Sequence, residues 1–155
     1  MKRKRLFLLC IVIGIVVIFL VLQTLGYTGI GIRMNFQTVS KAFHSRIVTA
    51  EYRVIQDNTE WANLWNLSQQ IYPTPDPLPQ VNFSEKMIIA VSMGIRPSSG
   101  YEIEVKEIID SGLTVVVKVQ NTYPAEGYGV LDIMTSPYHI VEIEKISRPI
   151  IFNTR

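Results

Sequence analysis

One long apolar run near the N-terminus constrains this chain more than any other feature. Between Leu6 and Leu25, sixteen residues are Leu, Ile, Val or Phe and none is charged. A helix rises about 1.5 Å per residue, so roughly twenty residues cross the hydrocarbon core of a bilayer. Each central Leu, Ile, Val or Phe favours insertion by about 0.3–0.6 kcal/mol, which outweighs the cost of Gln23 and Thr24 at the far edge. The run predicts one transmembrane helix over residues 6–25.

A cleaved secretory signal is the main alternative to this helix. The apolar part of such a signal usually spans about 7–15 residues and ends in a small-residue A-x-A-like site. This run is longer, and the first alanine of the chain is Ala42. We therefore expect an uncleaved single-pass anchor in the cell membrane. The basic segment over residues 1–5, with Lys2 to Arg5, predicts a cytoplasmic N-terminus and an extracytoplasmic C-terminal domain.

Beyond the anchor the chain is slightly acidic. The whole sequence carries +2, but residues 26–155 contain eleven Lys or Arg against thirteen Asp or Glu, a net charge of −2. The pI near 8.7 therefore reflects the basic residues ahead of the apolar run. Because no basic face remains to contact phosphates, we expect no nucleic-acid partner.

The residue types needed for catalysis or metal binding are sparse. Cys10 is the only cysteine and lies inside the apolar run, and His44 and His139 are the only histidines. Ser136 and Asp132 lie near His139, which suggests a triad. In an extended strand, however, Ser136 and His139 are an odd number of residues apart and point to opposite faces. We expect no enzyme, no metal and no cofactor.

The exported part is predicted to contain a linker, one domain and a tail. Residues 26–45 form the juxtamembrane linker, residues 46–149 a β-rich domain, and residues 150–155 a tail. Within the linker, Phe36, Val39 and Phe43 recur at helical spacing. They form either an amphipathic turn at the bilayer surface or the first edge of the core, and we favour the core.

A single helix and a proline-rich connector follow the first predicted strand. Asp57 and Glu60 have the spacing of a capping box. Five residues after this box recur at three- and four-residue steps, and this stripe predicts one helix face packed on a sheet. A connector over residues 72–79 contains four prolines and must be extended. The stripe consists of Trp61, Leu64, Trp65, Ser68 and Ile71.

Apolar, β-branched and alternating segments predict the strands. They cover residues 46–56, 86–94, 101–106, 113–119 and 138–146, with a hairpin loop at Asp110-Ser111-Gly112. A shift in the apolar alternation suggests a β-bulge between Ile140 and Val141. The fold class is therefore α+β and mostly β, a small β-sandwich or half-barrel with one covering helix, preceded by the transmembrane helix.

Three segments of this domain follow one another in a distinctive order. They are residues 81–88 (VNFSEKMI), 97–101 (PSSGY) and 136–141 (SPYHIV), separated by Gly94 and Pro124. From about residue 54 to 145 the chain resembles the C-terminal domain of the PrcB family of protease-complex subunits. Asn82 departs from the pattern, which has an acidic residue there. The resemblance implies an accessory, non-catalytic domain of exported bacterial proteins, in some cases alongside a protease.

A second, shorter resemblance concerns the loops. The turn over residues 97–101, the pair Gly127 and Gly129 and the corner over residues 136–138 are similar to the three inhibitory loops of chagasin-type cysteine-protease inhibitors. This resemblance implies a loop-based protease inhibitor on an immunoglobulin-like sandwich. Loop clustering at one end of the sandwich would support it, and loops at opposite ends would exclude it.

We therefore expect a membrane-anchored extracytoplasmic accessory or binding module that contacts a protein, with a protease or another envelope protein as candidates. The alternatives are the loop-based inhibitor and an envelope structural protein without a ligand. For Tyr101 and Tyr138, a place in the core is an equal alternative to partner contact. The candidate partner-binding residues are Pro97, Gly100, Tyr101, Tyr128, Pro137 and Tyr138.

Overall fold

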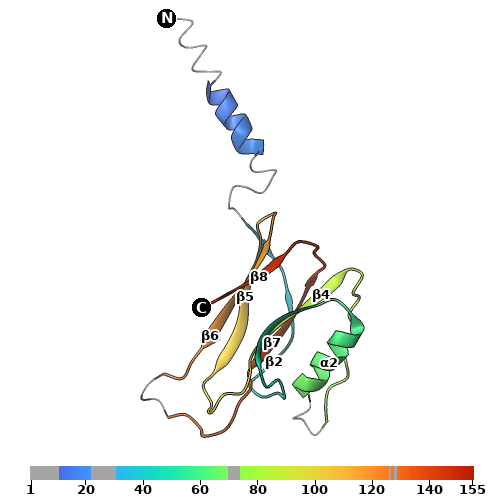
Figure 1. Cartoon of the computed structure of the whole chain (residues 1–155), viewed down its shortest axis with the longest axis vertical. Helices are drawn as coiled ribbons and strands as arrows, with labels where there is room; N and C mark the ends of the chain where they lie inside the picture. Colours follow the sequence, from blue (N-terminus) through green and yellow to red (C-terminus); the bar gives the residue numbers. More distant parts are fainter. Residues whose placement is uncertain (1–10, 22–30, 70–73, 126, 128) are drawn as a thin grey trace, which may run out of the picture.

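Two four-stranded sheets and one covering helix form the domain (Figure 1). The computed structural model describes residues 11–21, 31–69, 74–125, 127 and 129–155. One sheet has the strand order β1-β5-β6-β8 and the other β2-β7-β4-β3. All neighbours are antiparallel except β6 and β8, which are parallel. The elements are β1 (Ile32–Met34), β2 (Gln37–Ala42), β3 (Ala50–Ile55), α2 (Asn58–Gln69), β4 (Lys86–Met93), β5 (Glu102–Asp110), β6 (Val115–Thr122), β7 (Tyr138–Glu144) and β8 (Ile150–Thr154).

The sheet that contains β4 and β7 is buried on both faces. Alternate residues of β4, such as Met87 and Ile89, face the other sheet and pack with Val105 and Val117. The intervening residues, such as Ile88, face α2. This double burial explains why β4 is an uninterrupted apolar segment and not an alternating one. The predicted class, a mostly β α+β fold with two sheets, is confirmed.

Helix α2 begins and packs as its sequence predicts. The Asp57 Oδ1 atom accepts hydrogen bonds from the backbone N–H groups of Thr59 and Glu60, each at 2.9 Å, and so caps the first turn. The indole N–H of Trp61 donates to the Pro79 carbonyl at 2.9 Å, and that of Trp65 donates to the Asp76 carbonyl at 3.1 Å. The tryptophans therefore hold the connector on the helix. Trp61, Leu64, Trp65 and Ser68 are buried, whereas Ile71 lies outside the described residues.

Two segments that we expected outside the domain belong to its sheets. Part of the predicted linker, residues 26–45, forms β1 and β2, and most of the predicted tail, residues 150–155, forms β8. The first predicted strand, residues 46–56, is β3, the third along the chain. Since β1, β2 and β8 are edge strands with one neighbour each, they bury few side chains and show a weak alternation. Phe36 and Val39 pack on the core as favoured, whereas Phe43 is exposed.

The predicted bulge lies on the neighbouring strand. The pairing of β7 with β4 is regular from Tyr138 to Glu144, so the prediction of a bulge between Ile140 and Val141 is wrong. The register shifts instead in β2, where Val39 is the extra residue opposite that step. The apolar alternation of β7 is broken at this step because both faces of the strand are buried. Ile140 faces α2 and Val141 faces the other sheet, so both are apolar.

Residues 11–21 form a helix with mostly exposed apolar side chains. The predicted span over residues 6–25 extends beyond this helix on both sides, outside the described residues. Within the described part of the chain, no helix is both long and apolar enough to cross a bilayer.

We predict that Trp61→Ala lowers the free energy of unfolding by roughly 3–5 kcal/mol, because it removes a fully buried side chain and the hydrogen bond to Pro79. Urea denaturation of the full-length protein measures this loss. Asn63→Ala, on the exposed face of the same helix, should change it by less than about 0.5 kcal/mol. A similar loss in both variants would contradict the packing role of the tryptophan stripe.

Candidate functional site

Three connections meet at one end of the sandwich. They are residues 43–49 between β2 and β3, residues 94–101 between β4 and β5, and residues 123–137 between β6 and β7 (Figure 1). Arg96 and Thr135 exchange backbone hydrogen bonds of 2.8 and 2.9 Å. The Ile95 N–H donates to the Val48 carbonyl at 3.2 Å. This end is opposite the one where β1 begins, because Ile32 pairs with Asp110 at the far end of β5.

These connections expose a concentration of large apolar side chains, which we name the apolar loop end. Leu131 and Met134 are 71% and 70% exposed. The exposed fractions of the eight side chains range from 43% to 71%, whereas monomeric proteins rarely expose contiguous apolar patches larger than a few hundred Å². The eight residues are Phe43, Val48, Ile95, Tyr123, Val130, Leu131, Ile133 and Met134.

Hydrogen bonds between the connections hold the apolar loop end in shape. The Ser99 N–H donates to the Leu131 carbonyl at 3.0 Å, and the Leu131 N–H donates to the Ser99 hydroxyl at 2.8 Å. The Thr135 hydroxyl donates to the Ser98 carbonyl at 2.9 Å. Gly100 has a φ of +91°, and a Cβ atom there would lie 3.2 Å from Pro124. A surface ordered in this way loses little conformational entropy on binding.

The predicted partner-binding residues divide between this surface and the core. Pro97 and Gly100 are exposed on the apolar loop end. Tyr101 is half-buried, with the Arg96 guanidinium 5.7 Å from its ring centre and the Tyr123 ring at 6.0 Å. Tyr128 lies outside the described residues.

Pro137 and Tyr138 are not on the surface, which corrects the expectation of partner contact there. Tyr138 is 1% exposed, packs under α2 and hydrogen-bonds to the Ser40 hydroxyl at 2.9 Å. Tyr138 is the first residue of β7, and its side chain lies on the face of this strand that α2 covers. Leu131 and Met134 were not among the predicted partner-binding residues. Their signal was a cluster of apolar residues, 130–134, inside a segment without strand alternation.

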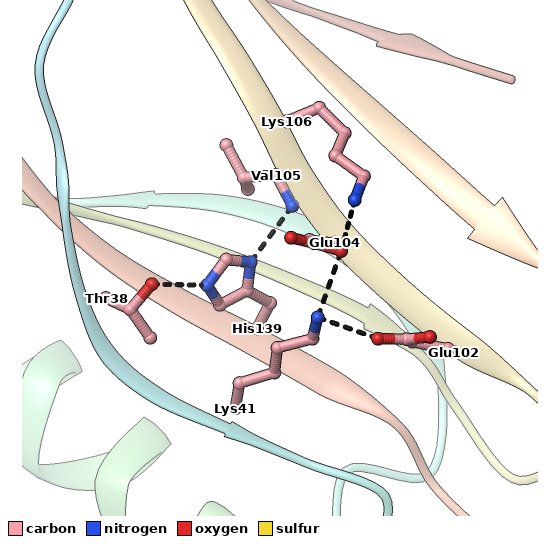
Figure 2. Close-up of polar contacts among 7 residues, drawn as sticks. All are labelled: Thr38, Lys41, Glu102, Glu104, Val105, Lys106 and His139. Atoms are coloured by element: carbon pink, nitrogen blue, oxygen red, sulfur yellow. Dashed lines mark hydrogen bonds and ion pairs between the residues drawn. The ribbon is translucent and has the colours of Figure 1, made fainter.

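A second cluster, around His139, joins the two sheets (Figure 2). His139 is 2% exposed and lies on β7. Its Nδ1 atom accepts a hydrogen bond from the Val105 N–H on β5 at 3.0 Å. Nδ1 therefore carries no proton, and Nε2 donates to the Thr38 hydroxyl on β2 at 2.9 Å. Burial, followed by the charge of Lys41, lowers the pKa of His139 from 6.5 to about 4.

Ion pairs surround this histidine at the open edge of β5. Because β1 pairs only with residues 108–110, the first half of β5 has no strand beside it on that edge in the described structure. Lys41 on β2 contacts Glu102 at 2.7 Å and Glu104 at 3.0 Å, and Lys106 contacts Glu104 at 2.6 Å (Figure 2). Burial opposes the charged form of Lys41, but these carboxylates outweigh it and raise its pKa. The cluster thus connects β2 of one sheet to β5 of the other.

Ser136 and His139, which suggested a triad in the sequence, both hydrogen-bond to neighbouring strands and loops. The Ser136 hydroxyl donates to the Ile47 carbonyl and also contacts the Ser45 hydroxyl at 2.9 Å. The two ring nitrogens of His139 are occupied by Val105 and Thr38. Each polar side chain therefore connects strands or loops. In the described residues, no three His, Cys, Asp or Glu side chains are grouped as metal ligands.

The fold and these two clusters define a small two-sheet α+β protein with an ordered apolar loop end. Comparison with protein families matches residues 87–144 to the family described as PrcB C-terminal. This segment runs from β4 to the end of β7 and contains two of the three connections of the apolar loop end. The resemblance stated from the sequence is confirmed over these residues. Searches of curated proteins and of solved structures found no match.

We predict that stability falls as the pH is lowered from about 6.5 to about 4. In this window unfolded histidine binds a proton and folded His139 does not, so acid favours the unfolded chain by up to roughly 3 kcal/mol. Above about pH 6.5 the imidazole is neutral in both the folded and the unfolded chain, so its protonation no longer lowers stability. Urea midpoints measured across this range test the prediction.

His139→Asn should flatten that slope, because the amide oxygen can still accept from the Val105 N–H but does not titrate. His44→Asn is the matched control, since His44 is exposed. An unchanged slope in His139→Asn would show that another group governs the acid sensitivity.

Proposed function

We propose that this protein is a membrane-anchored, extracytoplasmic accessory module that binds a protein partner through its apolar loop end. The observation that carries the proposal is the concentration of large exposed apolar side chains on three connections that are hydrogen-bonded to one another. Isolated exposed apolar residues are ordinary on protein surfaces, but a group of this size is typical of an interaction site.

The kind of partner follows from the shape and charge of this surface. Within the β6–β7 connection, Asp132 is the one charged residue among residues 129–137. A partner that contacts residues 129–137 therefore offers an apolar, largely uncharged surface, and its binding should depend only weakly on salt. The match to the family described as PrcB C-terminal supports the resemblance stated from the sequence, and that resemblance implies an accessory domain found in some cases alongside a protease. A protease or a protein of a protease complex is therefore the first candidate.

The anchor and its orientation rest on the sequence. Residues 6–25 have the length and composition of a membrane span, and Lys2 to Arg5 lie on its N-terminal side. In this arrangement the apolar loop end, at the opposite end of the domain from Ile32, is the part of the protein that faces away from the membrane.

Orientation is testable on intact cells. We expect a C-terminal epitope on the full-length protein to bind antibody without permeabilisation, and the protein to remain in the membrane fraction after carbonate extraction. An N-terminal epitope should need permeabilisation. A C-terminal epitope that is accessible only in permeabilised cells, or a protein released by carbonate, would contradict the proposed topology.

Partner binding is tested by a photoreactive amino acid placed at Leu131, and at Leu113 as the control. Leu113 is similarly apolar and 55% exposed, but lies in the β5–β6 hairpin at the other end of the domain. We expect position 131 to cross-link one protein that position 113 does not. Equal products at both positions, or none at either, would contradict a binding surface at the apolar loop end.

Leu131→Asp combined with Met134→Asp should lower the affinity for that partner at least tenfold, because a buried Leu or Met contributes about 1.5–3 kcal/mol. Both side chains are exposed in the free protein, so its thermal stability should be unchanged. Leu113→Asp should leave the affinity unchanged. A double variant that still binds normally would show that the contact lies elsewhere.

A protease inhibitor is the second candidate, favoured by the clustering of the loops. Pro97, Gly100, Gly127 and Gly129 are exposed on neighbouring connections, as inhibitory loops have to be. The third element, Ser136 to Tyr138, is buried and cannot enter a cleft as it stands. Inhibition of a papain-type protease at micromolar concentration would favour the inhibitor over a binding module.

A further inference from the structure

Two sheets have four edge strands, and three of the four carry features that discourage pairing with another chain. β1 has only three residues, β2 contains the bulge at Val39, and β3 carries Glu51 and Arg53. Short length, bulges and charges are the usual protections of a sheet edge. β8 has none of them. Its five residues, IIFNT, are uncharged and mostly β-branched or aromatic.

The backbone of β8 presents one set of polar groups outward. At its C-terminal end the Arg155 N–H donates to the Val119 carbonyl at 3.0 Å, and the Arg155 carbonyl accepts from the Asn121 N–H at 2.9 Å. At its other end the Pro149 carbonyl accepts from the Val115 N–H at 2.9 Å. Odd-numbered residues therefore face β6. By alternation, Ile150, Phe152 and Thr154 direct their N–H and C=O groups to the free edge, where the described structure has no further strand.

We propose that β8 pairs with β8 of a second copy of this chain, in antiparallel register centred on Phe152. This register is self-complementary. Ile150 lies opposite Thr154 of the second copy and Phe152 opposite Phe152, so the outward groups meet and form about six hydrogen bonds. Ile151 lies opposite Asn153 of the second copy in the close, non-hydrogen-bonded pair. The strand contains no charged residue, so the pairing brings no like charges together. The twofold arrangement extends the sheet from four strands to eight.

The side chains of β8 are compatible with this pairing. Ile150 and Phe152 point into the sandwich and pack on its core, so pairing leaves them in place. Ile151 and Asn153 are exposed on the outer face. The contact is small, so the dimer should be weak, in the micromolar range or above. Pairing at β8 does not involve the side chains of the apolar loop end.

Register-specific cross-linking of the full-length protein in detergent tests the pairing. In a Cys10→Ser background, a mixture of Ile151→Cys and Asn153→Cys copies should form a disulfide-linked dimer on mild oxidation, because the two positions lie opposite each other. Either variant alone should cross-link at least fivefold less, and so should Leu113→Cys. Equal yields in all four samples would overturn the proposed register.

Charge variants test the pairing without cysteine. Ile151→Glu with Asn153→Glu places like charges opposite each other and should weaken dimerisation at least tenfold in analytical ultracentrifugation. Mixing this variant with an Ile151→Lys, Asn153→Lys copy should restore a dimer, which shows that both variants are folded. A wild-type protein that is monomeric at every concentration, or a dimer that persists in the double-Glu variant, would overturn the proposal.

Discussion

The burial of β4 and β7 on both faces is the constraint on which the rest of the fold depends. Their alternate residues face the other sheet on one side and α2 on the other. Neither layer alone could bury this pair, since one uncovered face would expose apolar side chains along both strands. The helix and the second sheet are therefore required together, and the tryptophans that hold the connector on α2 contribute to the same burial.

A central pair with two apolar faces leaves few places for polar groups, and His139 shows how one is accommodated. It lies on the inter-sheet face of β7, where a charged imidazole would be strongly destabilised. Val105 and Thr38 satisfy both ring nitrogens, so the neutral ring acts as a polar connection between three strands. The ion pairs of Lys41 lie beside this histidine and are partly exposed, so solvent reduces their contribution. This cluster serves the fold and leaves the binding surface to the loops.

The sequence predicts the centre of this structure well and its periphery poorly. The double-faced β4, the alternating β5, the hairpin at Gly112 and the capped helix at Asp57 have strong local patterns, and each lies where expected. β1, β2 and β8 bury few residues, so their patterns are weak and they were assigned to a linker and a tail. The candidate site divides in the same way. Loop residues such as Gly100 were found from turn chemistry, but Tyr138 was placed on the surface because burial against α2 depends on tertiary packing.

The two exposed features of the domain differ in what they can recognise. The apolar loop end offers side chains on an irregular, ordered surface, so its specificity depends on the shape and apolarity of a groove in the partner. The β8 edge offers backbone groups at a regular spacing, so any extended strand of matching register satisfies it. The self-complementary register around Phe152 makes a second copy the partner that needs no further sequence information. Since the loops lie at the end of the sandwich and β8 along its side, both surfaces can be occupied at once.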